Sequence, residues 1–190
     1  MVLTPAVGFS LAGLPTDRAG LAVAIAELSS VAEQRDLERC RILTAILLRH
    51  PILLRDVEHA YSALDLPPSL AVLRDALHEW VESAEILEPQ ALMTHLTLSG
   101  LQAEADQALA MVPVPLPACA SLAAMPAEAE AGWWHIFGFL SVQQLDEEIA
   151  LANASFQKDP TVHNQNRLIA LKAALNKVAS GEPDGVELAA

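Results

Sequence analysis

Apolar residues in the last third of the chain recur at helical spacing along two neighbouring segments. Each set falls on one stripe of a helix with 3.6 residues per turn, which predicts two amphipathic helices. The first stripe consists of Leu145, Ile149, Ala152 and Phe156, and the second of Leu168, Leu171, Leu175 and Val178.

Asp159-Pro160-Thr161 separates the two stripes and predicts a tight turn. Pro160 has no N–H to lose at a first helical position, and Asp159 can cap the free amides behind it. Two stripes joined by such a turn predict an antiparallel helical hairpin over residues 127–180. We expect its first arm to be one helix that continues from Trp133 to the turn.

The preceding part of the chain predicts a helical bundle over residues 37–112. A helix from about Asp36 to His50 ends there because Pro51 disfavours a helical residue before it. Gly100 predicts a left-handed helix cap. The further helices are expected at 51–61, 69–84, 90–98 and 102–111, with Leu54, Val57, Tyr61, Leu70, Leu73, Leu77 and Trp80/Val81 facing inward.

The remaining segments flank or join these two parts. Residues 1–36 form an N-terminal extension with a probable helix, whose register weakens near Ser29-Ser30 and predicts a break. Residues 113–126 are rich in proline and predict an extended linker. Residues 181–190 form a short acidic tail. The predicted fold class is all-α, an N-terminal helical bundle followed by a C-terminal antiparallel helical hairpin.

The first turns of the predicted hairpin carry apolar residues on almost every side of the helix. An isolated hairpin cannot hide so many apolar residues, so some must pack on another surface. We favour the bundle over a partner protein as that surface, because this part of the chain adjoins the linker. The residues concerned are Trp133, Trp134, Ile136, Phe137, Phe139 and Leu140.

Composition agrees with a helical protein of one domain, or one domain with an appended module. The 190 residues are 53% hydrophobic, with few aromatics, and few windows show the alternation expected of strands. The net charge is −13, and residues 58–157 carry one basic residue against fourteen acidic ones. Such a surface repels a phosphate backbone, so we expect no direct nucleic-acid binding.

The two cysteines and the N-terminus bear on localisation. Cys40 and Cys119 lie far apart without a paired motif, which suits a reduced cytoplasm, and Cys40 falls at an inner helical position. The apolar N-terminus lacks a preceding basic region, and prolines interrupt the uncharged run 107–127. We therefore expect a cytoplasmic protein without a membrane partner.

Catalytic and metal-binding motifs are missing from the sequence. Nucleotide-binding glycine loops, HExxH and the nucleophile elbow do not occur. The six histidines, His59 beside Glu58 among them, are best explained as lone surface or half-buried residues. Asp146-Glu147-Glu148 is best explained as a solvated charge cluster. We expect no enzyme activity, no catalytic residue, no cofactor, no metal and no small-molecule ligand.

The order of these features resembles the C-terminal domain of bacterial DNA primase (DnaG type). The segment Ile42 to Leu54, with its Leu-Leu-Arg-His-Pro centre, resembles the opening of that domain. Residues 70–77 and 92–100 resemble the helices that follow. Trp134, residues 145–152, the Asp159-Pro160-Thr161 turn and residues 166–171 resemble its terminal hairpin. The resemblance covers residues 37–180.

The resemblance implies a helicase-binding domain that recruits primase to the hexameric replicative helicase (DnaB type) and modulates primer synthesis. The primase zinc and catalytic domains are absent, so the chain is not expected to make primers alone. Hairpin docking is a helix-in-groove kind of recognition. The candidate partner-binding residues are Leu151, Phe156, Val162, Asn166, Arg167 and Ile169. Val162 and Ile169 lie off the inner stripe of the second helix, where they either face a partner or widen the internal seam.

Three other readings stay open. The N-terminal domain of a replicative helicase has a similar form, although the acidic tail and chain end after the hairpin favour primase. A helical small-molecule-binding bundle would use a pocket at Trp133 and Trp134. An adaptor unrelated to replication would use the acidic middle segment to bind a basic partner, and its binding would depend strongly on salt.

Overall fold

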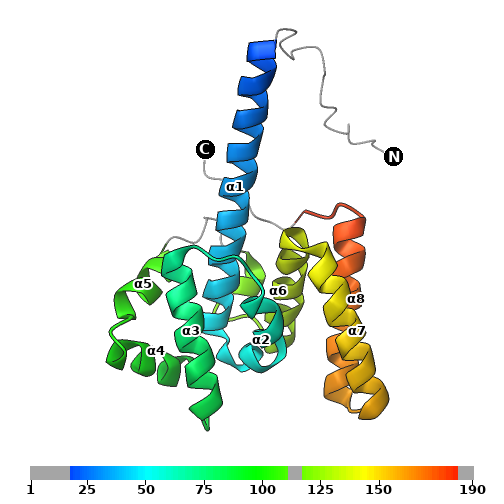
Figure 1. The fold of residues 1–190 in the computed structure, drawn as a ribbon. Helices are drawn as coiled ribbons and strands as arrows, with labels where there is room; N and C mark the ends of the chain where they lie inside the picture. Colours follow the sequence, from blue (N-terminus) through cyan, green and yellow to red (C-terminus); the bar gives the residue numbers. More distant parts are fainter. Residues whose placement is uncertain (1–17, 111–116, 184–190) are drawn as a thin grey trace. The chain divides into compact units, whose positions relative to one another are not determined.

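The computed structural model describes residues 18–110 and 117–183, with side chains from residue 26 onward. Its elements confirm the all-α fold class, and the described residues form no strand (Figure 1). The chain divides into two compact units, residues 1–35 and 36–190. The elements are α1 (Arg18–Arg49), η2 (Pro51–Leu53), α2 (Leu54–Ser62), α3 (Pro68–Ser83), α4 (Pro89–Leu98), α5 (Gln102–Ala110), η3 (Ala118–Ala120), α6 (Pro126–Leu140), α7 (Val142–Lys158) and α8 (Val162–Ala179).

The first helix is longer than predicted. The expected break near Ser29-Ser30 is wrong, because α1 continues through both serines to Arg49. Serine lowers helix propensity by only a few tenths of a kcal/mol, roughly, and no glycine or proline interrupts this stretch. As predicted, the helix ends just before Pro51. His50 has non-helical backbone angles, with φ −129° and ψ 63°.

The predicted inner faces of the bundle are confirmed. Every one of the seven predicted inward residues from Leu54 to Trp80 is buried. Gly100 has φ 75° and closes α4 in the left-handed conformation, as its position predicted. The predicted last residue of α5, Met111, lies outside the described residues.

Helix α6 buries its aromatic side chains against the bundle, as expected. Trp133 and Trp134 are fully buried, and the Trp133 ring lies 6.5 Å from that of Tyr61 on α2. Phe137 stacks on Trp133 with centroids 5.2 Å apart. Phe139 is half-buried, and the Arg39 guanidinium lies 4.8 Å from its ring centroid. The hydrophobic core therefore runs without interruption from α1 and α2 into α6.

The described end of the predicted linker is held against the bundle. Arg49 Nη1 donates a hydrogen bond to the carbonyl of Ala120 at 2.6 Å, and His50 Nε2 donates to the carbonyl of Ser121 at 2.8 Å. Gly132 on α6 lies directly against the Cys119 side chain, where no Cβ would fit. Residues 111–116, which hold most of the expected extended segment, lie outside the described residues.

The prediction of one continuous helix from Trp133 to the turn is wrong. This stretch consists of two helices, α6 and α7, separated by Ser141 in extended geometry with φ −154° and ψ 96°. The Ser141 hydroxyl caps α7 by accepting a hydrogen bond from the Gln144 amide at 3.2 Å. The capping sequence Ser-x-x-Gln was visible in the chain and marks a helix start.

Helix α8 packs on both α6 and α7, so the C-terminal part is a three-helix arrangement rather than a bare hairpin. Gly138 on α6 makes the approach close, since a Cβ there would lie 2.9 Å from both Leu145 and Val178. In Figure 1, α7 and α8 lie side by side and meet at the Asp159–Thr161 turn.

The subdivision of 37–180 into bundle, linker and hairpin subdomains stays a prediction, because residues 36–190 cluster as one compact unit. Of the predicted 1–36 extension and 181–190 tail, residues 1–17 and 184–190 lie outside the described residues. None of the helices in the described part is both long and apolar enough to cross a membrane.

Candidate protein-binding surface

The turn between α7 and α8 is built differently from the prediction. Thr161, rather than Asp159, caps α8, and its hydroxyl accepts a hydrogen bond from the Asn164 amide at 3.2 Å. The Asn164 side-chain amide donates to the Asp159 carbonyl at 2.7 Å. Helix α8 begins at Val162, so Pro160 stands in the turn and not at the first helical position. Threonine is itself a preferred cap, so the sequence carried this signal.

Four of the six candidate partner-binding residues are exposed on the hairpin. Leu151, Val162 and Ile169 have 49%, 72% and 57% of their surface exposed, and Asn166 is exposed as well. Phe156 is half-buried and packs on the core. The sequence predicts two roles for Phe156, one on the inner stripe of the first arm and one as a partner-binding residue. The structure shows the inner position.

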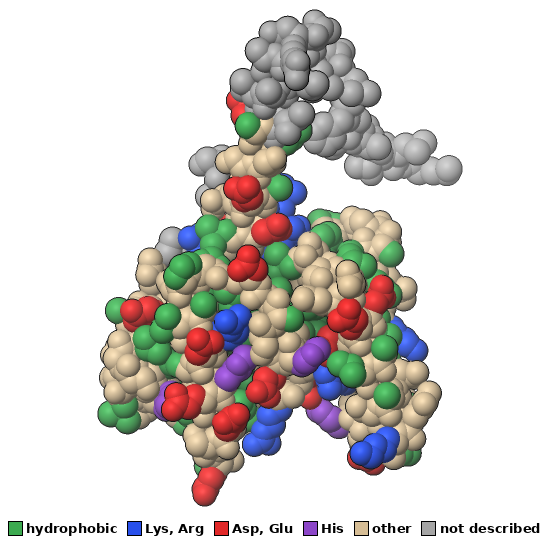
Figure 2. Space-filling view, in the orientation of Figure 1, with side chains coloured by type: hydrophobic (Ala, Val, Ile, Leu, Met, Phe, Trp, Pro, Cys, Tyr) green, Lys and Arg blue, Asp and Glu red, His purple; other side chains and the backbone are tan. Residues whose placement is uncertain are grey.

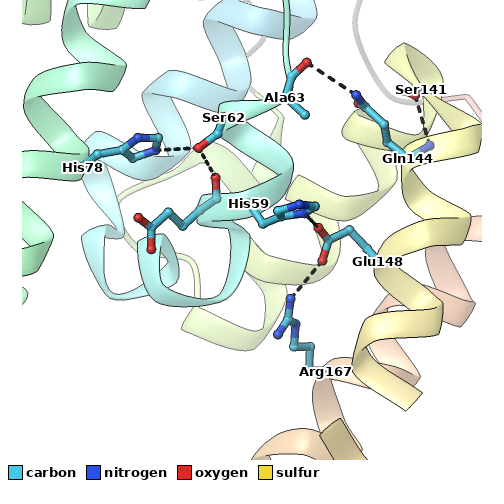
Figure 3. Close-up of polar contacts among 9 residues, drawn as sticks. His59, Ser62, Ala63, His78, Ser141, Gln144, Glu148 and Arg167 are labelled. Atoms are coloured by element: carbon cyan, nitrogen blue, oxygen red, sulfur yellow. Dashed lines mark hydrogen bonds and ion pairs between the residues drawn. The ribbon is translucent and has the colours of Figure 1, made fainter. Parts of the chain in front are cut away.

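Arg167, the sixth candidate, is occupied within the protein. Its Nη2 donates a hydrogen bond to Glu148 Oε2 at 3.0 Å, and its side chain is 20% exposed (Figure 3). Glu148 is 1% exposed, and its other oxygen accepts a hydrogen bond from His59 Nδ1 at 2.6 Å. The carboxylate therefore joins α2 of the bundle to α7 and α8, as Figure 3 shows.

This junction corrects two expectations. Glu148 is not part of a solvated cluster, although Asp146 and Glu147 beside it are exposed. His59 is not a lone histidine, since it pairs with Glu148 from a helix 89 positions away in the sequence. Glu148 follows Leu145 by three residues and precedes Ala152 by four, which places it on the inner stripe. Helical register could have found it.

Other histidines also have partners. His163 Nε2 lies 3.0 Å from Asp56 Oδ1, so α8 also contacts α2 directly. The His78 ring lies edge-on to Tyr61 with centroids 6.2 Å apart, and its Nε2 lies 3.5 Å from the Ser62 hydroxyl (Figure 3). These contacts place His78 and His163 at helix interfaces.

Burial favours the protonated forms of the Cys40 thiol and the Tyr61 hydroxyl. Burial raises the pKa of the Cys40 thiol to about 11, which keeps it protonated, and the predicted inner position of Cys40 is confirmed. Burial also raises the pKa of Tyr61. Its hydroxyl donates to Thr44 Oγ1 at 2.8 Å, since Thr44 gives its own proton to the Cys40 carbonyl.

The described residues contain no group of three or more His, Cys, Asp or Glu side chains placed to hold a metal ion. Acidic side chains on the face drawn in Figure 2 stand as separate spots over the bundle and hairpin. A spread of this kind offers no single acidic patch on that face. Large apolar side chains are exposed at several places among the described residues, and Leu151, Val162 and Ile169 are those on the hairpin that were also candidate partner-binding residues.

Comparisons with known proteins identify no relative. No family model matches the chain, and neither a curated protein nor a solved structure is significantly similar to it.

Proposed function

We propose that this chain is a non-catalytic interaction module that binds the N-terminal domains of a hexameric replicative helicase and so recruits a DNA primase. The proposal rests on the order of sequence features that resemble a primase C-terminal domain. The observation that carries it is the exposure of Leu151, Val162 and Ile169 on α7 and α8. Exposed large apolar side chains on a rigid hairpin are typical anchors for a partner groove.

The contacts on the inner side of the hairpin support a binding role for its exposed side. The caps at Ser141 and Thr161 define where α7 and α8 begin, and the Glu148 junction ties both helices to α2. The exposed apolar residues are therefore held in place before a partner binds. Preorganised anchors lose less conformational freedom on binding than mobile ones.

A small-molecule pocket at the tryptophans has less support. Trp133 and Trp134 are fully buried, and their ring centroids lie 4.9 Å apart. The volume that such a ligand would occupy is filled by the protein's own side chains.

The test is capture of the cognate helicase hexamer by the full chain, with affinity measured by calorimetry. We expect Ile169→Asp to weaken binding about tenfold, because a charge replaces an apolar anchor at the interface. Ile86→Asp is the matched control: Ile86 is 62% exposed in the α3–α4 loop, and its substitution should leave affinity unchanged. Arg167→Glu is a poor test, because it would place a second carboxylate against buried Glu148.

Three results would count against the proposal. The wild-type chain could fail to bind the helicase, Ile169→Asp could bind as well as wild type, or both substitutions could weaken binding equally. If the chain instead exchanges into helicase rings and is captured by a primase C-terminal domain, it is the helicase-side domain of similar form.

A further inference from the structure

A groove lies where the bundle, α6 and α8 meet, next to the candidate binding residue Asn166. Its walls are mainly apolar, and its volume is about 440 Å³, within the range of roughly 300–1,000 Å³ common for ligand sites. The lining residues are Ile52, Leu53, Arg55, Asp56, Pro126, Ala127, Glu130, His163 and Asn166.

Two carboxylates from different helices line this groove. Asp56 lies on α2 and is paired with His163, whereas Glu130 lies on α6. Glu130 is half-buried and its Oε1 atom is shielded from solvent; the indole N–H of Trp134 is a donor beside this carboxylate, but no hydrogen bond of standard geometry joins the two. A shielded acceptor with a poorly placed donor is costly, so a ligand that supplies a better-placed donor gains affinity from it.

The electrostatics of Glu130 favour a cation. Burial, as the largest cause, and the nearby Asp56 carboxylate both raise the pKa of Glu130. Trp134, His163 and Arg167 oppose that rise but do not cancel it. A cation in the groove would reverse the rise and form a charge-assisted hydrogen bond.

We propose that this groove binds an arginine side chain presented by the partner protein, with its methylene stem along Ile52 and Ala127 and its guanidinium at Glu130 and Asp56. A stem with an apolar surface and a planar donor tip matches an apolar wall that ends in two carboxylates. Arg55, which is exposed, and His163, which pairs with Asp56, are the basic side chains in the lining. The inference rests on the proposed function only in taking the ligand to be part of a protein.

The test uses the full chain and Nα-acetyl-arginine amide, followed by NMR shifts of backbone amides at millimolar concentrations. We expect saturable shifts confined to residues 52–56, 126–130 and 163–166. The uncharged analogue Nα-acetyl-citrulline amide should bind about tenfold more weakly, since it keeps the shape and loses the charge.

Glu130→Gln should weaken binding of the arginine probe about tenfold and should leave the fold intact, because the glutamine side chain keeps an oxygen that can accept from the Trp134 indole N–H. Asp56→Asn serves as the second variant, and Glu147→Gln, at an exposed carboxylate on α7, is the matched control that should bind like wild type. Equal binding of the two probes, absence of saturable shifts, or wild-type binding by both groove variants would overturn the proposal.

These outcomes are separable from failure of the proposed function. A chain that captures helicase but gives no arginine-specific shift excludes the groove alone. If the chain binds the arginine probe through Glu130 but does not bind helicase, the groove proposal stands and the proposed helicase-binding function is wrong.

Discussion

The core around Trp133 and the junction around Glu148 hold neighbouring helices to the same bundle by opposite means. Trp133 is fully buried among aromatic rings, and its contacts are non-directional and spread over a large area. Glu148 is equally buried but depends on two hydrogen bonds, one to each neighbouring helix. The first arrangement stabilises the fold as a whole, whereas the second fixes where the hairpin sits.

The largest effect should come from the core. Trp133→Ala removes a buried aromatic side chain and should lower the free energy of unfolding by about 4 kcal/mol, measured by urea denaturation. Leu122→Ala, at a residue 68% exposed, should change it by less than about 0.5 kcal/mol. Similar losses in the two variants would mean that α6 does not pack on the bundle as described.

The junction should give the next largest effect. Glu148→Ala leaves Arg167 without its partner and should cost about 2–3 kcal/mol. The contribution of His59 is smaller, because its side chain is 70% exposed and solvent screens the pair. Glu147→Ala is the control, with a change within about 0.5 kcal/mol. A loss for Glu148→Ala no larger than that of the control would show that the carboxylate is not a structural tie.

The sequence predicted the features that depend on local chemistry. The leucine stripes, the end of α1 before Pro51 and the left-handed cap at Gly100 each follow from a few adjacent residues, and the structure contains them. The same periodicity put Val162 and Ile169 off the inner stripe but left open whether they face outward or widen the internal seam, and the structure exposes both. Whether they bind a partner stays a prediction.

Two of the features that were missed depend on contacts between distant segments. No spacing pattern joins His59 to Glu148, because the pair forms only when α2 and α7 come together. Arg167 looked like a free anchor for the same reason. The break at Ser141 was missed although its capping signal is local, because the apolar run on both sides suggested one continuous helix.

The cap at Ser141 should have a moderate effect. Ser141→Ala removes the hydroxyl that accepts from the Gln144 amide and should cost about 1 kcal/mol in thermal or urea unfolding. Ser155→Ala changes an exposed serine within α7 and should be neutral or slightly stabilising. If the two variants behave alike, the hydroxyl does not hold the start of α7.

The smallest effect should be a pH dependence at Glu130. Because its pKa is raised above the ordinary value of 4.5, the folded protein holds this proton more tightly than the unfolded chain does. Its contribution to stability is therefore greatest at low pH and falls as pH rises from about 4.5 through the raised pKa. Glu130→Gln should flatten that fall and be more stable than wild type at pH 7, as measured by urea unfolding across pH. Parallel wild-type and variant curves would contradict this.

The bare backbone at Gly138 has a consequence for the outer surface. Because the side chain of Gly138 is a single hydrogen, the side chains of Leu145 and Val178 approach α6 more closely than any larger residue would allow. The spacing between α6 and the Val178 end of α8 is therefore set by Gly138, and a larger side chain there would push that end of α8 outward.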